Sequence, residues 1–425
     1  MDLNGMAPMG GNAKILVIGG GISGLTAAIE ASEAGADVVL VEKNPWLGGR
    51  VAQMHQYFPK LCPPSCGLEI NLRRVRTNPR IRCLTQATVE NITGQPGHYQ
   101  VTIRQEPRFV NRKCTLCGAC ADVCPVERAD EYNLGMGKTK TAYLPFPTAY
   151  PAIFAIDGKT CKGTSCGKCV DACKYGAIEL EAKTETIQEE VGAVVVATGW
   201  DPYDATNLKE LGYGTCKNVI TNLMMERLAS NTGPTGGKIQ RPSDGKAPAS
   251  VAFVQCAGSR DDNFQKHCSG VCCMGSLKQT RYIREQYPDT MIYVFYIDIR
   301  TPGRLEDFYQ DVQKDEKVIL IKGKVAKVTE MAGGSVEVVA EDTLNGTRVK
   351  QQVDLAVLAT GLTPTQPASK IEAGGGLRKD DFGFLTSEQG SPGIVPAGST
   401  KRPVDVAACV RDATAAALQA LQHAR

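Results

Sequence analysis

The sequence has 425 residues, 42% of them hydrophobic and 22% charged, and a net charge of +3 at pH 7. This length and composition indicate a globular protein of about two or three domains, and the small charge argues against nucleic-acid binding. The chain holds 17 cysteines. Residues 1–14 carry no export signal and no stretch is apolar enough to span a membrane. We therefore expect a cytoplasmic protein whose thiols bind metal rather than form disulfides.

The first predicted elements form one βαβ unit. A buried strand over 14–18 leads into the glycine-rich turn 19–24, which is followed by an Ala-rich helix over 25–34 and a second strand over 37–41. Glycine permits the tight turn and the approach of a pyrophosphate, and the helix N-terminus supplies N–H groups. Glu42, at the end of the second strand, has the position to accept a hydrogen bond from a ribose hydroxyl. The glycines of this GxGxxG motif are Gly19, Gly21 and Gly24.

Residues 109–185 have a different texture, with eight cysteines and little helix or strand periodicity, and are expected to form an inserted module. The first four cysteines are spaced C-x2-C-x2-C-x3-C and precede Pro125, and the second four are spaced C-x4-C-x2-C-x3-C and precede Lys174. This repeat is typical of ferredoxin-like loops, in which the fourth cysteine of each set binds the other [4Fe–4S] cluster. Structural zinc is the alternative, although its ligands usually come as two pairs across a longer gap.

The crossed pattern gives two ligand sets, which are Cys114, Cys117, Cys120 and Cys173 for one cluster, and Cys161, Cys166, Cys169 and Cys124 for the other.

Later segments predict further strands at 191–199, 251–254, 291–295 and 353–361, and a C-terminal helix at 404–421. The strand over 251–254 stands where a second nucleotide-binding strand is expected, but it leads into Cys256 and not into a glycine-rich turn. This argues against a nicotinamide nucleotide at that place. Three more cysteines follow at Cys268, Cys272 and Cys273. Their spacing leaves three interpretations open: a third [4Fe–4S] cluster, a buried structural set, or a redox-active vicinal thiol pair.

Several segments resemble those of FAD proteins such as thioredoxin reductase and glutathione reductase. A Gly-Gly-Arg segment at 48–50 follows the acidic residue, and two predicted strands end in Ala-Thr-Gly at 197–199 and 359–361. The segment 393–398 is similar to the strand beneath the flavin, with Ser399 in place of the usual Asp. The resemblance implies FAD as cofactor and an α/β fold with two dinucleotide-binding domains, here with the ferredoxin-like α+β module inserted.

The residues implied to contact FAD, besides the GxGxxG glycines, are Glu42, Lys43, Gly49, Arg50, Thr198, Gly199, Thr360, Gly361, Gly398 and Ser399. The predicted layout is an FAD-binding domain in three pieces (1–108, 186–200 and 353–425), the inserted module (109–185) and a second nucleotide-binding-like domain (201–352).

Nearly the whole chain resembles the A subunit of heterodisulfide reductases. The segments that carry this likeness are 144–147, 233–238, 255–260, 268–273 and 295–300. The resemblance implies that Cys256, Cys268, Cys272 and Cys273 hold a third [4Fe–4S] cluster. It also implies a lysine close to the flavin, which Lys278 matches; the alternative for Lys278 is a solvated charge on a helix.

The segment 57–67 resembles the A subunits of the quinone-interacting membrane-bound oxidoreductases of sulfate-reducing organisms, and the chain ends where those compact subunits end. This likeness implies two partner subunits, a second flavoprotein of the heterodisulfide reductase A type and a membrane subunit with haem b and iron–sulfur clusters. They would attach the chain peripherally to the inner membrane and link menaquinone with adenylylsulfate reductase. The alternatives are a stand-alone NAD(P)H-dependent flavoprotein reductase and an electron-bifurcating heterodisulfide reductase subunit.

Five cysteines lie outside the three sets. Cys62 and Cys66 are expected to be structural thiols, with a redox pair or a partner contact as alternatives. Cys83, Cys216 and Cys409 are expected to be buried small hydrophobic residues.

Overall fold

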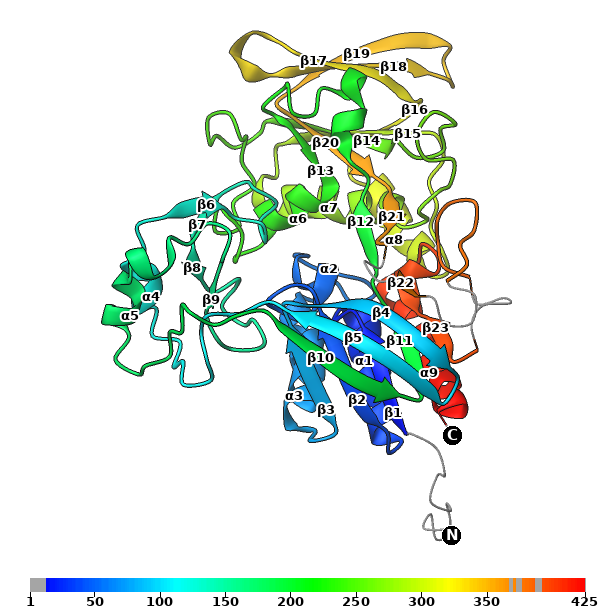
Figure 1. The fold of residues 1–425 in the computed structure, drawn as a ribbon. Helices are drawn as coiled ribbons and strands as arrows, with labels where there is room; N and C mark the ends of the chain where they lie inside the picture. Colours follow the sequence, from blue (N-terminus) through cyan, green and yellow to red (C-terminus); the bar gives the residue numbers. More distant parts are fainter. Residues whose placement is uncertain (1–12, 367–369, 372–376, 387–391, 425) are drawn as a thin grey trace. The chain divides into compact units, whose positions relative to one another are not determined.

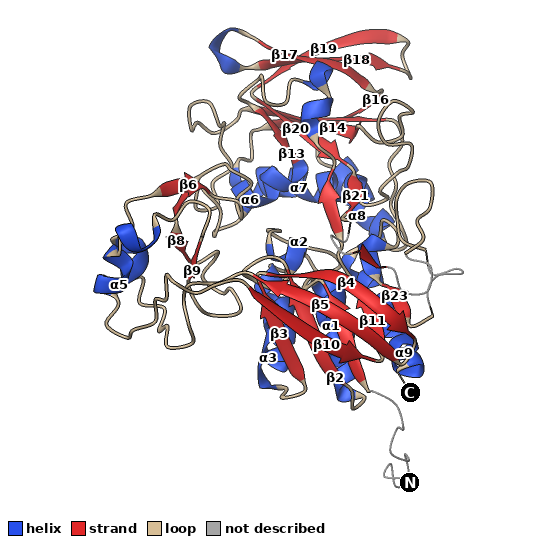
Figure 2. Ribbon diagram, viewed as in Figure 1, coloured by secondary structure: helices blue, strands red, loops and turns tan. Residues whose placement is uncertain are grey.

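The structure, a computed structural model, describes residues 13–366, 370–371, 377–386 and 392–424. The chain divides into two compact units, which are residues 1–200 with 364–425 (unit 1) and residues 201–363 (unit 2). Strands and helices alternate in both units (Figure 1, Figure 2). Each unit is described by itself.

Unit 1 is built on a five-stranded parallel sheet in the order β23-β11-β1-β2-β3. Its strands are β1 (Lys14–Ile18), β2 (Asp37–Glu42), β3 (Ile81–Thr85), β11 (Ala193–Val196) and β23 (Ile394–Pro396). They are continuous apolar runs because both faces of the sheet are covered. The helices of unit 1 outside the insertion are α1 (Ile22–Glu33), α2 (Gly49–Ala52), α3 (Pro64–Thr77) and α9 (Val406–His423).

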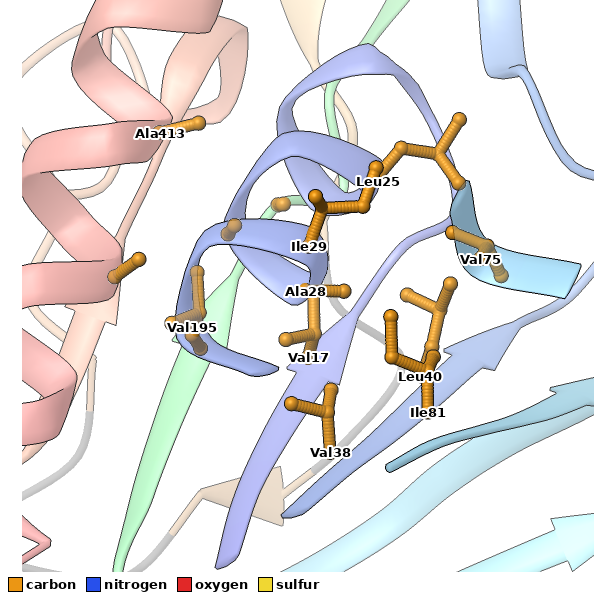
Figure 3. Packing of buried hydrophobic residues seen from close by; sticks show 14 of the residues in the cluster. Val17, Leu25, Ala28, Ile29, Val38, Leu40, Val75, Ile81, Val195 and Ala413 are labelled. Atoms are coloured by element: carbon orange, nitrogen blue, oxygen red, sulfur yellow. The ribbon is translucent and has the colours of Figure 1, made fainter. Parts of the chain in front are cut away.

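Two apolar layers hold this sheet in place. On one face Val17, Val38 and Leu40 of the strands pack with Leu25 and Ile29 of α1 (Figure 3). On the other face the core continues into a second sheet in the order β10-β5-β4-β22. Its strands are β4 (Ala87–Gln95), β5 (His98–Gln105), β10 (Glu185–Val191) and β22 (Lys370–Ile371). The predicted βαβ unit and C-terminal helix are therefore confirmed, with shifts of a few residues at their ends.

The insertion between β5 and β10 has little regular structure, as its sequence predicts. Its elements are α4 (Ala119–Asp122), α5 (Lys168–Ala172), β6 (Glu127–Ala129), β7 (Lys138–Lys140), β8 (Ala142–Tyr143) and β9 (Ala155–Ile156). An isolated antiparallel bridge joins Val110 to Ile178, so the two ends of the insertion lie together. A small core forms around Phe154, Ile156 and Ala177, and several of the cysteines pack against it.

Unit 2 has a five-stranded parallel sheet in the order β13-β20-β14-β15-β16 and a three-stranded antiparallel sheet in the order β17-β18-β19. Its strands are β13 (Val219–Thr221), β14 (Ser250–Ala257), β15 (Met291–Tyr296), β16 (Val318–Lys322), β17 (Val325–Glu330), β18 (Val336–Asp342), β19 (Thr347–Val353) and β20 (Leu355–Thr360). Its helices are α6 (Asn222–Ala229), α7 (Cys272–Gln286) and α8 (Leu305–Gln313). The chain enters and leaves unit 2 through the paired strands β12 (Trp200–Pro202) and β21 (Leu362–Pro364).

One predicted domain boundary was wrong. Residues 353–425 were expected to return as a whole to the FAD-binding domain, but β20 lies in the sheet of unit 2, between β13 and β14. Unit 1 resumes only at Pro364. The error has a physical reason: a buried apolar strand that ends in Ala-Thr-Gly fits either parallel sheet, so its sequence alone does not say which neighbours it pairs with.

Candidate functional site

Only glycine fits at Gly19, in the turn between β1 and α1, and at Gly24, in the first turn of α1. A Cβ on Gly19, whose φ is +107°, would lie 2.3 Å from the carbonyl oxygen of Ala197, and a Cβ on Gly24 would lie 1.7 Å from that of Gly19. Gly21 differs, because a Cβ there would meet nothing nearer than the Cα of Gly49 at 3.8 Å. No described side chain caps the N-terminus of α1. The turn thus leaves backbone N–H groups and open space in front of the helix, which fits a pyrophosphate.

Glu42 lies beside this turn and is buried. Its Oε2 accepts a hydrogen bond from the N–H of Gly20 at 2.7 Å, and its Oε1 accepts from both the backbone and the side chain of Asn44 at 2.8 Å. Burial raises the pKa of the Glu42 carboxyl, although these hydrogen bonds and Lys43 oppose the shift. Each carboxylate oxygen can accept more than one hydrogen bond, so Glu42 can also accept from a ribose hydroxyl.

The Gly-Gly-Arg segment packs directly against the first turn. The N–H of Gly48 donates to the carbonyl of Gly20 at 2.8 Å, and a Cβ on Gly49 would lie 2.8 Å from the Cα of Gly21. Arg50 donates to the carbonyl of Trp200 at 3.3 Å, and its guanidinium lies 5.7 Å from the centre of the Trp200 ring. This segment therefore forms a second wall beside the phosphate turn.

A third turn follows β23. Gly398 has φ +71°, and a Cβ there would lie 2.0 Å from the Oγ of Ser23. Ser399 is buried, and its Oγ lies 3.3 Å from the Sγ of Cys409. Thr198, after β11, bonds to Thr400 with 3.0 Å between their Oγ1 atoms. The predicted FAD residues of unit 1 thus gather at the carboxyl ends of β1, β2, β11 and β23, where open parallel sheets bind nucleotides.

The inserted module supports the crossed assignment of its cysteines. A pocket in the module is lined by Cys124 together with Cys161, Cys166 and Cys169, and by none of the other four. These four are the predicted ligands of one cluster. Burial raises the pKa of the Cys169 thiol, and Cys161 and Cys124 add to this shift. Among the described residues no three His, Cys, Asp or Glu side chains are grouped as they would be around a metal ion, so the assignment rests on this pocket.

The other predicted set is less complete. Burial raises the pKa of the Cys120 thiol to about 11, and the nearby Cys114 raises it further. Cys117 is exposed, and the Sγ of Cys173 accepts from the N–H of Ala177 at 3.4 Å. The structure places Cys114 near Cys120, while the joining of Cys117 and Cys173 to them stays a prediction.

Arg108 connects the module to the FAD-binding part of unit 1. Its guanidinium donates to the carbonyl of Pro45 at 2.8 Å and to the hydroxyl of Thr85 at 3.1 Å, both outside the module. It also donates to the carbonyls of Ile153 and Phe154 inside the module, at 3.0 and 3.1 Å. Burial lowers the pKa of Arg108 to about 10.

Aromatic packing strengthens the same junction. Tyr132 stacks on Phe146 within the module at 4.6 Å. Across the junction it meets Trp46 edge-on at 5.7 Å and donates its hydroxyl to the carbonyl of Ala52. The N–H of Leu47, next to Gly48, donates to the carbonyl of Tyr150 at 2.8 Å. The module is therefore fixed to the very segment that walls the phosphate turn. Nothing in the sequence had marked Arg108 or Tyr132, because only the fold brings their partners together.

The third cysteine set is assembled in unit 2, between β14 and the first turn of α7. Burial raises the pKa of the Cys256 thiol to about 11, and Cys273 and Cys268 add to this shift. Burial also raises the pKa of the Cys272 thiol, to which Cys273, Cys256 and Cys268 contribute. The Sγ of Cys273 lies 3.7 Å from the carbonyl oxygen of Asp298. The four thiols thus influence one another in a partly buried place, which fits the cluster interpretation, while the cluster itself stays a prediction.

Two other predicted FAD residues lie next to this set. The carbonyl of Thr360 is 3.7 Å from the Sγ of Cys272. A Cβ on Gly361 would lie 2.2 Å from the Oγ of Ser259 and 2.8 Å from that of Ser269. Both residues thus shape the cysteine site of unit 2, and their predicted contact with FAD stays a prediction.

Lys278 is not a solvated charge. It is buried on α7, and its Nζ lies 3.0 Å from the Oε1 of Glu226, which is equally buried on α6. Gln279 and Tyr282 also donate to Glu226, at 2.6 and 3.3 Å. The predicted proximity of Lys278 to the flavin stays a prediction.

The remaining cysteines follow the sequence interpretation in part. Cys216 and Cys409 are buried, and Cys83 packs at the edge of the core of unit 1. Cys62 is half-buried and Cys66 exposed, at the start of α3.

Comparison with known proteins agrees with this geometry. Residues 14–105 match the FAD dependent oxidoreductase family and residues 107–127 the 4Fe-4S binding domain. An iron-sulfur A subunit of the CoB–CoM heterodisulfide reductase of Methanopyrus kandleri is 40% identical over 419 residues, covering 96% of this chain and 64% of the relative. The A subunit of the H2:CoB-CoM heterodisulfide, ferredoxin reductase of Methanothermobacter marburgensis is 38% identical, covering 96% and 63%. The chain spans less than two thirds of the length of these relatives.

Solved structures confirm the predicted fold class. Thioredoxin reductase from Lactococcus lactis matches with a TM-score of 0.52 and 14% identity, covering 97% of this chain and 98% of that one. The enzyme from T. acidophilum matches with a TM-score of 0.51 and 13% identity, covering 96% and 97%. No helix in the described part of the chain has the length and apolar character needed to cross a bilayer.

Proposed function

We propose that the chain belongs to the family of heterodisulfide reductase A subunits and that it transfers electrons within a larger redox complex. When bound, FAD supplies two-electron chemistry and [4Fe–4S] clusters supply one-electron chemistry, so the two together can join different kinds of redox partner. The chain's own residues hold these groups at fixed positions and set their surroundings.

The observation that carries this proposal is the junction inside unit 1. Arg108 makes two hydrogen bonds to each side of it, and Tyr132 and Tyr150 bond to Ala52 and Leu47, which flank the segment that walls the phosphate turn. A module that only stabilised the fold would not need to be fixed at the cofactor loop. Electron transfer does need such a fixed separation, because its rate falls steeply with distance.

The residues present fit these groups. The turns at 19–24, 48–50 and 398–399, with Glu42 between them, would hold FAD. The eight cysteines of the module would hold two clusters in the crossed pattern, and the cysteine set of unit 2 would hold a third. The stand-alone NAD(P)H reductase is disfavoured, because β14 carries Cys256 near its end and leads into a long loop where a nicotinamide nucleotide would need a glycine-rich turn.

Two settings are proposed for the complex. The names of the relatives favour a heterodisulfide-reducing complex, in which electron bifurcation at the flavin is one form of the activity. The segment 57–67 favours a quinone-linked complex. Its partners would be a second flavoprotein of the same type and a membrane subunit with haem b and iron–sulfur clusters, with adenylylsulfate reductase as redox partner and peripheral attachment to the inner membrane.

The test is anaerobic purification of the native complex, with quantification of iron, sulfide and flavin and identification of the subunits. We expect about twelve iron and about one FAD per chain, as three [4Fe–4S] clusters require. A membrane subunit with haem supports the quinone-linked setting, and a heterodisulfide-reducing subunit supports the other. Zinc in place of iron, or a single chain whose flavin is bleached by NADH, would contradict the proposal.

A further inference from the structure

A charged residue, Arg260, lies beside the cysteine site of unit 2. The proposed role of the cysteines as cluster ligands does not require a charge at this position. Arg260 lies four residues after Cys256, in the loop that follows β14, and its charge acts on the Cys256 sulfur. Its guanidinium donates a hydrogen bond to Asp298, with 2.6 Å between Nη1 and Oδ1. Arg260 therefore lies close to a predicted cluster ligand and is paired with a carboxylate.

The backbone is bent to place these two side chains. Cys256 and Arg260 have φ values of +55° and +58°, in the left-handed region that residues with side chains seldom adopt. Such a conformation is unfavourable for a residue with a side chain, and the rest of the fold must offset its cost. Strain at both ends of one short turn indicates that the positions of both side chains matter, and a glycine at either place would relieve it.

Asp298 also lies next to a second cysteine of the set. Its backbone oxygen is 3.7 Å from the Sγ of Cys273, so the segment that follows β15 contacts the set. Arg300 lies 3.6 Å from the same Asp298 carboxylate. The charges beside the site thus include two arginines and one aspartate; Arg260 acts on Cys256, and Arg300 acts on Cys273.

We propose that Arg260 sets the reduction potential of the cluster at this site, with Asp298 as the opposing charge. The inference rests on the proposed third cluster. Hydrogen bonds to the sulfurs and nearby charge are among the factors that fix the potential of an iron–sulfur cluster. A guanidinium beside Cys256 stabilises the reduced and more negative state, so it raises the potential. The Asp298 carboxylate partly cancels that charge and lowers the potential. Arg260 is a positioning residue in this sense, because it acts through the ligand.

The experiment is a redox titration of the holo-complex, followed by the electron paramagnetic resonance signal of each cluster. The signal of the third cluster is identified as the one lost in the C256S variant. We expect R260Q to lower its midpoint potential, so that the ratio of reduced to oxidised cluster at a fixed potential falls about tenfold, a shift of about 59 mV for one electron. R260K keeps the charge without the planar fork and should shift the potential less.

The D298N variant gives the matched test, because it leaves Arg260 in place and should raise the same potential. The signals of the two clusters in the inserted module serve as internal controls and should not move in either variant. Opposite shifts in R260Q and D298N support the inference, and D298N still decides if R260Q loses its iron. An unmoved potential in both variants, or shifts of the same sign, would overturn it. A wild-type complex with only about eight iron would remove the third cluster itself, and with it this role of Arg260, while the two-cluster relay would stand.

Discussion

The two junctions that follow the central strands of the two parallel sheets can be compared directly. β1 is the middle strand of one five-stranded sheet and β14 of the other, and each is followed by a helix. After β1 only 19–21 separate strand from helix, and glycines let backbone N–H groups face a phosphate. After β14 the connection runs over 258–271, and cysteine side chains lie within it and at both of its ends. The same place in the fold would thus serve two chemistries, by backbone in one sheet and by side chain in the other.

The difference teaches what each chemistry asks of the chain. A phosphate turn must omit side chains in two ways: at Gly21 so that the backbone can approach the ligand, and at Gly24 so that α1 can pack against the turn, where a Cβ would lie 1.7 Å from the carbonyl oxygen of Gly19. A thiolate site must instead direct side chains inward, so it needs a longer loop and accepts strain at Cys256 and Arg260. Both helices start at their site, and α7 carries Cys272 and Cys273 in its first turn.

The largest expected effect concerns the turn after β1, where Gly24 is needed for packing and Gly21 leaves space for the ligand. G24A should prevent FAD binding and destabilise the apoprotein by about 3 kcal/mol or more, because the new methyl group collides with a backbone carbonyl. G21A should also abolish FAD binding, yet change the unfolding free energy by less than about 1 kcal/mol, because its methyl group meets only the ligand's space. Thermal unfolding and FAD titration of both apoproteins measure this. Equal stability of the two variants would contradict the role assigned to Gly24.

The second prediction concerns the helices that follow the two junctions. The buried face of α1 is made of small and apolar residues, whereas α7 buries Lys278 against Glu226 of α6. K278M should destabilise unit 2 by about 3–5 kcal/mol, because it leaves a buried carboxylate without its cation. The double variant K278M/E226Q should recover most of this loss, as chemical denaturation can measure. If the single variant is as stable as the wild type, the ion pair does not contribute to the fold.

Comparison of sequence and structure shows which parts of each junction are predictable. The glycine turn, Glu42 and the cysteine spacings are local patterns whose chemistry is fixed by neighbours in the chain, and the sequence analysis found them. The placement of β20 depends on which strands it pairs with, and Arg108 and Arg260 matter through partners that are distant in the chain. No local pattern reports such contacts, so the domain boundary was wrong and both arginines were missed.

The third prediction tests the second junction by composition. C272S should lower the iron content of the purified complex by about four atoms per chain, because one [4Fe–4S] cluster loses a ligand. FAD content should not change, and the clusters of the inserted module should keep their signals, since their ligands lie in unit 1. C216S is the matched control, because Cys216 is buried in unit 2 but belongs to none of the three sets. Unchanged iron in C272S, or an equal loss in C216S, would mean that the cysteine set of unit 2 holds no cluster.

The smallest expected effect concerns the acidic residue of the first junction. E42Q keeps the shape of Glu42 but removes the charge that accepts from a ribose hydroxyl, so FAD should bind about tenfold more weakly, which corresponds to about 1.4 kcal/mol. Isothermal titration of the apoprotein with FAD measures the change. G35A, in the turn after α1, is a control, because a Cβ at Gly35 meets no atom within 4 Å. It should leave FAD affinity unchanged.

The pH dependence of the same residue gives a sharper result. Burial raises the pKa of Glu42 above its ordinary value of 4.5, so the folded protein takes up this proton at a higher pH than the unfolded chain does. The stability of the apoprotein that this proton provides is fully present below about pH 4.5 and is lost as the pH rises through the raised pKa. E42Q should remove this dependence of stability on pH, because its amide does not titrate, while FAD binds more weakly. A variant that keeps the wild-type dependence on pH would show that Glu42 is not its cause.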